Sequence, residues 1–243
     1  MHTKVADAST VRRARRCGLD AVVYAPHFTQ LPRIETRAAA LSTESLAVIP
    51  AREIFTGNWR SRRHVLAIGL SEPVPDFIPL ADALEELERQ GAAILVPHPT
   101  FFTVSLTVAE VHAYGDVIDA VECYNPKLLP HHTRRAYRLA EDVGLPVFAS
   151  SYAHLRGTVG HAWTSFPEQI EDEEDLCEVL RKGALGTVGA EGGLGHLGRR
   201  MLEFSHLGWE NSAKKAHRVV GRQRAATHPD DPLYGDRFVI DGS

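Results

Sequence analysis

The feature that most constrains the fold is a repeated alternation between short apolar runs and longer amphipathic runs. The short runs are rich in Val, Ile and Ala, as buried strands are, and the longer ones carry apolar residues at helical spacing. We expect strands at 20–26, 46–54, 64–70, 92–99, 117–125 and 145–151, and helices at 9–18, 31–42, 80–91, 107–115, 131–144 and 172–183. This alternation predicts an α/β fold in which helices cover a parallel sheet. It does not distinguish an open sheet from a closed barrel.

Helix-end residues support several of these boundaries. Ser9 is the expected N-cap of the first helix, and Gly18 follows its end. The last helix begins with acidic residues and ends with Arg181 and Lys182, which complements the helix dipole. From about Gly186 the chain becomes rich in Gly, Arg, Lys and His. We therefore predict a main domain over 1–190 and a C-terminal helical and loop appendix over 191–243.

The composition narrows the class of protein. The chain has 243 residues, of which 44% are hydrophobic, so it can bury a substantial core. Its net charge of −4 does not favour nucleic acid as a partner. It has no apolar run of about 20 residues, so no membrane span is expected. Three widely spaced cysteines fit a reducing compartment, and we expect a cytoplasmic protein.

Polar side chains recur where the predicted strands end. The carboxyl ends of strands in α/β sheets and barrels are where active sites gather. The residues in this position are His27, Glu53, His98, Asn125 and His154. His64 fits the rule least well, because it opens its predicted strand. Any one of these histidines could be a structural side chain, and Asn125 could simply start a turn. Their joint recurrence instead indicates a metal site, since imidazole and carboxylate ligands together suit Zn, Mn or Fe.

The first part of the chain resembles the polymerase-and-histidinol-phosphatase (PHP) family of metal-dependent phosphoesterases. In "MHTKVADAS", His2 and Thr3 resemble the second half of the family's His-x-His-Thr motif, and Asp7 resembles the acid that follows it. The segment "GLDAVVYAPH" resembles the family's second motif and places His27 on its histidine.

Four later segments continue the resemblance in the same order. "VIPAREIFTG" resembles the segment with the metal-bridging glutamate, here Glu53, and "RHVLAIGL" resembles the one with a ligand histidine, here His64. "LVPHP" resembles the His-Pro motif and places His98 between two prolines. "SSYAHL" resembles the Ser-Asp-Ala-His motif and places His154 on its last histidine. The resemblance covers roughly residues 1–190.

Three departures from the family pattern bear on the site. The first histidine of His-x-His has no counterpart in this chain, Pro26 stands in place of one Asp, and Tyr152 stands in place of another. Losing two carboxylates removes hard oxygen ligands. A site with three metal ions is therefore not expected, whereas one or two ions remain compatible with the residues present.

The resemblance implies a distorted seven-stranded (β/α)7 barrel similar to a TIM barrel. It also implies a metal-dependent hydrolase of a small-molecule phosphate ester that uses metal-activated water. Arg156 is the candidate phosphate-binding residue, because a guanidinium pairs with phosphate through two hydrogen bonds. A catalytically inactive binding or structural subunit is the alternative, and an RNA-processing subunit is a weaker one. The implied metal ligands are His2, Asp7, His27, Glu53, His64, His98 and His154.

Overall fold

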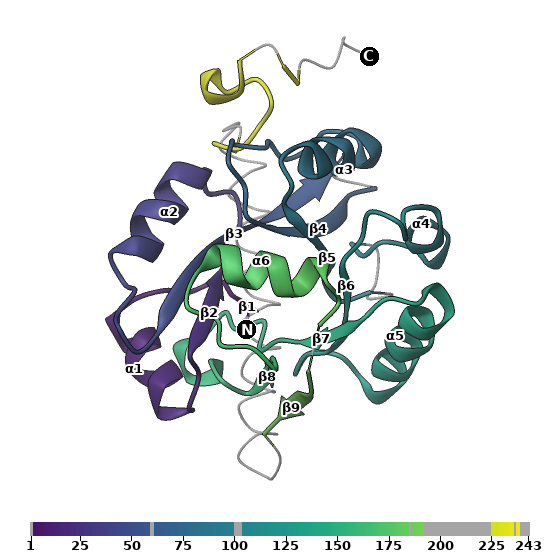
Figure 1. Ribbon diagram of the computed structural model, residues 1–243. Coiled ribbons are helices and arrows are strands. Elements are labelled where there is room, and N and C mark those ends of the chain that lie inside the picture. Colours follow the sequence, from purple (N-terminus) through teal and green to yellow (C-terminus); the bar gives the residue numbers. More distant parts are fainter. Residues whose placement is uncertain are drawn as a thin grey trace.

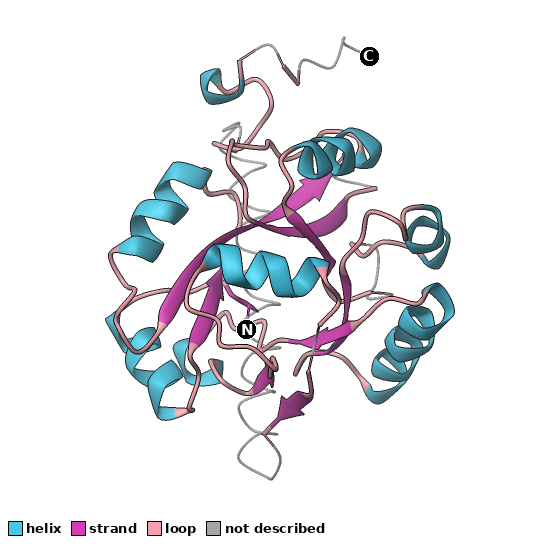
Figure 2. Ribbon diagram, viewed as in Figure 1, coloured by secondary structure: helices cyan, strands magenta, loops and turns pink. Residues whose placement is uncertain are grey.

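The computed structural model describes residues 2–58, 61–99, 104–184, 186–191, 225–235 and 237–238. Its centre is a seven-stranded sheet whose strands are hydrogen-bonded in chain order (Figures 1 and 2). The strands are β1 (His2–Thr3), β2 (Ala21–Tyr24), β3 (Ala47–Thr56), β4 (Arg63–Ile68), β5 (Ala93–Val96), β6 (Ala120–Tyr124) and β7 (Val147–Ala149). The helices are α1 (Ala8–Arg16), α2 (Leu31–Ala39), α3 (Leu80–Arg89), α4 (Val108–Ala113), α5 (Pro130–Val143) and α6 (Glu173–Arg181).

The expected α/β architecture is confirmed, but the sheet is not wholly parallel. Strand β4 runs antiparallel to both of its neighbours, β3 and β5. Only residues 57–62 connect β3 to β4, whereas a parallel crossover needs a dozen residues or more. The regular (β/α)7 repeat is thus broken at this hairpin.

The sheet curls until its two ends meet. Thr3 in β1 forms a parallel bridge with Ala153, which follows β7, and the Lys4 N–H donates to the Ala153 carbonyl at 2.9 Å. Helices α1 to α5 lie around the outside of the curled sheet in Figure 1. This contact brings the start of the chain beside the segment that carries His154.

Alternation along the strands sorts side chains between two cores. Outward residues such as Val65, Ala67 and Ile94 form one buried cluster, which includes residues of the outer helices. Inward residues such as Leu66 and Ala51 pack with α6, which lies across the middle of the ring of strands in Figure 1. By the same alternation Glu53, His64 and Glu122 belong to the inward set.

Helix α1 begins one residue earlier than expected and has a different cap. Asp7, and not Ser9, is the N-cap, because its Oδ1 accepts hydrogen bonds from the Ser9 and Thr10 N–H groups, both at 2.9 Å. The expectation for Ser9 was wrong: a carboxylate two residues upstream satisfies the free N–H groups first.

A small two-stranded sheet and the end of the chain complete the described fold. The antiparallel pair β8 (Ala162–Thr164) and β9 (Val188–Ala190) was not expected from the sequence. Of the proposed appendix, residues 192–224 lie outside the described residues. Residues 225–235 include a turn and a short 3₁₀ helix at Pro232–Tyr234. None of the helices within the described part of the chain is long and apolar enough to cross a membrane.

Candidate metal centre

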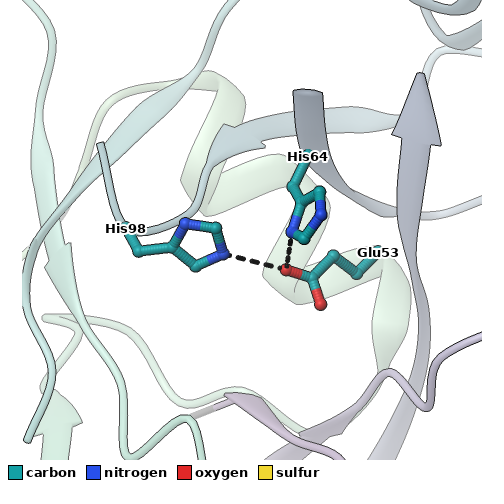
Figure 3. A group of neighbouring side chains, drawn as sticks. All are labelled: Glu53, His64 and His98. Atoms are coloured by element: carbon teal, nitrogen blue, oxygen red, sulfur yellow. Dashed lines mark hydrogen bonds and ion pairs between the residues drawn. The ribbon is translucent and has the colours of Figure 1, made fainter. Parts of the chain in front are cut away.

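Glu53 stands at the centre of the site, and its two carboxylate oxygens face two different sets of groups. Oε1 lies 3.2 Å from His64 Nδ1 and 3.1 Å from His98 Nε2 (Figure 3). Oε2 lies 2.8 Å from His27 Nε2 and accepts a hydrogen bond from the Lys4 ammonium. All these contacts are inside the protein, since Glu53 is fully buried. We call the first set the Oε1 side and the second the Oε2 side.

The antiparallel direction of β4 explains how His64 reaches this site. The carboxyl end of β3 and the amino end of β4 are neighbours, with Phe55 paired to His64. His64 therefore lies at the same end of the sheet as His98, which follows the parallel strand β5. The exception noted in the sequence follows the same spatial rule as the other histidines.

His98 is fixed in orientation by two buried groups. Its backbone has a φ of 35°, in the left-handed region that few non-glycine residues adopt. Its N–H donates to Glu122 Oε2 at 2.6 Å, and its carbonyl accepts from the Ser105 hydroxyl at 2.5 Å. These hydrogen bonds hold the turn that aims the ring at Glu53.

The hydrogen bonds of Ser105 also indicate which ring nitrogen of His98 carries the proton. Because the Ser105 hydroxyl donates to the His98 carbonyl, its oxygen accepts from His98 Nδ1–H at 3.2 Å. The Nε2 lone pair of a neutral His98 then faces Glu53 Oε1, which is also an acceptor. Two acceptors at 3.1 Å need a cation between them, either a proton or a metal ion.

His64 offers a second lone pair. Burial is the main cause that lowers the pKa of His64 to about 4, so its ring is neutral near pH 7. When its Nδ1–H donates to Glu53, Nε2 is left as an acceptor. This buried Nε2 has no hydrogen-bond partner among the described residues. One ligand atom from each of Glu53, His64 and His98 can be chosen so that all lie within 4.8 Å of one another.

On the Oε2 side, a lysine occupies the position opposite the carboxylate. The Lys4 side chain is 6% exposed, and burial lowers its pKa against the opposing effect of Glu53. Burial, followed by the positive charge of Lys4, lowers the pKa of His27 to about 3. Burial would raise the pKa of Glu53, but the charge of Lys4 and hydrogen bonds from His27 and His64 hold it well below its ordinary value. Glu53 is therefore ionised at neutral pH.

A second buried lysine holds His154. Lys127 Nζ donates to the Tyr152 carbonyl at 2.7 Å and lies 2.6 Å from His154 Nδ1. The ammonium also lies 4.2 Å from the centre of the Tyr152 ring, and Lys4 lies 5.4 Å from the same centre. Burial and then Lys127 lower the pKa of His154 well below its ordinary value. His154 Nδ1 also lies 3.1 Å from the Tyr152 carbonyl, so it faces both the ammonium of Lys127 and an acceptor.

The remaining residues implied by the resemblance lie in other settings. Asp7 caps α1, and its Oδ2 pairs with Arg156 Nε at 2.7 Å. The Arg156 side chain is 68% exposed. His2 lies in β1, and its side chain is outside the described residues. Their roles as ligands or as a phosphate-binding residue stay predictions.

Sequence reasoning missed four residues that shape the site. Lys4 directly follows the His-Thr pair, and Glu122 is inward by alternation on β6, so both had a signal in the sequence. Lys127 and Ser105 had none, because only the fold brings them to His154 and His98. Glu122 connects the segments that follow β5, β6 and β7, since it accepts hydrogen bonds from the His98 N–H, Asn125 Nδ2 and Ser150 Oγ.

Comparisons with known proteins give both sequence and structural relatives. A family model described as PHP-associated matches residues 130–185. An uncharacterized protein of Methanocaldococcus jannaschii is 28% identical over 135 residues, which are 53% of this chain and 55% of that protein. The match therefore spans about half the length of this curated relative.

Several solved structures share the fold. PsfC from Pseudomonas syringae superposes with a TM-score of 0.59 at 17% identity, over 84% of this chain and 88% of that one. A two-domain protein from Bacteroides vulgatus that contains a predicted PHP-like metal-dependent phosphoesterase gives 0.56 at 19% identity, over 84% and 68%. An amidohydrolase from Chromobacterium violaceum gives 0.56 at 12% identity, over 78% and 96%. The PHP-associated match supports the resemblance to the PHP domain family seen in the motifs, and the solved structures show that the chain shares their fold.

Proposed function

We propose that this chain is a metal-dependent hydrolase that acts on a small-molecule phosphate ester. The observation that carries the proposal is the buried cluster of Glu53, His64 and His98, which could hold a metal ion. Resemblance to a family of metal-dependent phosphoesterases supports the reaction class. The assignment of a phosphate ester as the substrate rests on the resemblance to that family alone.

The groups on the Oε1 side fit a divalent cation. They are the ionised carboxylate of Glu53 and the imidazoles of His64 and His98, the ligand types that Zn, Mn and Fe accept in proteins. A cation would separate the facing acceptors of His98 and Glu53, and it could also use the buried Nε2 of His64. Both features are unfavourable without a cation, since buried polar atoms need partners.

When bound, such an ion would supply an activated water and a Lewis acid for a phosphoryl oxygen. The chain's own residues prepare the site for that chemistry. Glu53 is already ionised, and Ser105 and Glu122 fix His98 in position. The proposal assigns Arg156, which is exposed and paired with Asp7, to the substrate phosphate.

The test is hydrolysis of a panel of phosphate monoesters by protein loaded with Zn²⁺ or Mn²⁺. We expect chelator to abolish turnover and Glu53→Gln to lower kcat/KM by about 100-fold or more, since it loses the ionised ligand. Glu178→Gln is the control, because Glu178 is an exposed carboxylate on α6 that pairs with Lys182 at the end of the helix. Hydrolysis that survives both chelator and Glu53→Gln would contradict the proposal.

One observation favours the second candidate, a catalytically inactive binding or structural subunit. The Lys4 ammonium compensates the charge of Glu53 without any metal ion. Under this alternative the purified protein stays free of metal in excess Zn²⁺ and Mn²⁺, and no phosphate ester is hydrolysed. Metal content therefore separates the two candidates before a substrate is known.

A further inference from the structure

The two oxygens of Glu53 form two half-sites, and different groups of the protein face each one. Oε1 faces two imidazoles, which is a setting for a metal ion, whereas Oε2 faces one imidazole and one ammonium. A carboxylate that bridges two metal ions would give one oxygen to each ion. In this chain the second oxygen already has a cation that belongs to the protein.

The Lys4 ammonium is held in this place by the fold. The Lys4 N–H bonds to the Ala153 carbonyl, and Thr3 Oγ1 lies 3.3 Å from the same carbonyl. This bridge closes the sheet and fixes the base of the lysine side chain. The side chain is 6% exposed, and its ammonium lies against the Tyr152 ring. Lys4 is thus a buried part of the site.

The neighbouring groups also favour an organic cation over a metal ion on this side. Tyr152 stands where the PHP pattern has an Asp, so its ring faces the two ammoniums of Lys4 and Lys127 in place of a carboxylate. A second metal ion would therefore lack the carboxylate that the PHP pattern has at the position of Tyr152.

We infer that Lys4 takes the place of a second metal ion beside Glu53, so that the site binds one divalent ion and not two. The inference rests on the proposed metal-dependent function. A divalent ion on Oε2 would lie within a few ångströms of the ammonium, and two cations at that separation inside a protein repel strongly. Removing the positive charge of Lys4 opens the half-site formed by Oε2 and His27 Nε2.

The experiment counts ions per chain by elemental mass spectrometry after dialysis against buffered free Zn²⁺ or Mn²⁺. We expect one ion in the wild type and two in Lys4→Met. Lys4→Arg keeps the cation and should bind one. Lys182→Met removes an exposed lysine and should also bind one. If Lys4→Met does not fold, Lys4→Gln retains a hydrogen-bond donor toward Glu53 without the charge, and it should bind two.

The outcomes separate this inference from the function on which it rests. Two ions in the wild type, or one ion in both wild type and neutral variants, would overturn the role of Lys4 and leave the metal-dependent function intact. No ion in the wild type or in any variant would contradict the function itself. One ion rising to two in the neutral variants alone supports both.

Discussion

At the residue scale, a carboxylate as deeply buried as Glu53 needs compensating charge or donors around it. Lys4 supplies the charge, and His27 and His64 can supply N–H donors. His98 cannot donate while its proton is on Nδ1, because Nε2 is the nitrogen that faces Glu53. The position that lacks a proton is therefore the contact between His98 and Oε1, which is where a metal ion would be most stabilising.

The orientation of His98 depends on the Ser105 hydroxyl, which predicts the effect of Ser105→Ala. Groups that orient a metal-binding histidine typically contribute about 10- to 100-fold to metal affinity. We expect a loss of that size for Zn²⁺, measured by competition with a chromogenic chelator. Ser42→Ala is the control, because Ser42 also bonds to backbone groups, near the end of α2. Equal Zn²⁺ affinity in the wild type and Ser105→Ala would show that the ring needs no such support.

At the element scale, the antiparallel strand β4 is what gathers the ligands. A parallel β4 would have put His64 at the opposite end of the sheet from His98, since His64 is the second residue of its strand. The short connection 57–62 forces the reversal, and Glu53 then lies across the hairpin from Leu66, two residues from His64. The ligand set is thus a consequence of loop length as much as of residue type.

Helix α1 provides a prediction about Asp7, the residue that the motif suggested as a ligand. Its capping hydrogen bonds to Ser9 and Thr10 predict that Asp7→Ala lowers the free energy of unfolding by about 1 kcal/mol. Asp7→Asn should be nearly neutral, because Asn caps helices as well as Asp does. Urea unfolding measures both, and an unchanged stability of Asp7→Ala would contradict the capping role. The Zn²⁺ affinity of Asp7→Asn then tests separately whether Asp7 is a ligand.

The order of elements and the three residues of the cluster were predictable from the sequence. Apolar periodicity gave each strand from β2 to β7 and each helix to within a few residues, since these segments are buried on the faces that the pattern marks. Strand direction was not predictable in this way, because β4 has the same apolar character as the strands that pair in parallel elsewhere in the sheet. Lys4 was missed because a lysine is usually exposed, whereas here its side chain is buried beside Glu53 and the Tyr152 ring, which only the fold brings together.

At the scale of the whole molecule, the described C-terminal residues are tied to the main sheet. The Asp76 N–H donates to the Thr227 carbonyl at 2.7 Å, and the Thr227 hydroxyl donates to the Asp76 carboxylate. The same carboxylate pairs with Arg52 at 3.1 Å in a buried contact. Arg237 pairs with Glu86 on α3. Residues 225–235 and 237–238 are thus linked to β3 and α3, although the proposed helix before them lies outside the described residues.

The ion pair between Arg237 and Glu86 predicts that the free energy of unfolding changes with pH, and that Glu86 is responsible for the change. Hydrogen bonds from Arg89, then Gln90 and Arg237, lower the pKa of Glu86 to about 2. A folded-state pKa below the unfolded value stabilises the fold above about pH 4.5, and this contribution is lost as the pH falls toward 2. Since Arg89 and Arg237 are about half exposed, we expect a contribution of about 1 kcal/mol. Urea unfolding should show that Glu86→Gln is less stable than the wild type at pH 7 and equally stable near pH 2. A difference that does not change with pH would contradict this account.

The most direct test of the central claim is anomalous X-ray diffraction from crystals grown with Zn²⁺ or Mn²⁺, collected on both sides of the metal absorption edge. The account predicts a peak at ligand distance, about 2.0 to 2.2 Å, from Glu53 Oε1 and from one ring nitrogen each of His64 and His98. A peak elsewhere, with these three side chains in contact only with one another, would contradict the account. So would the absence of a peak in crystals soaked at saturating metal.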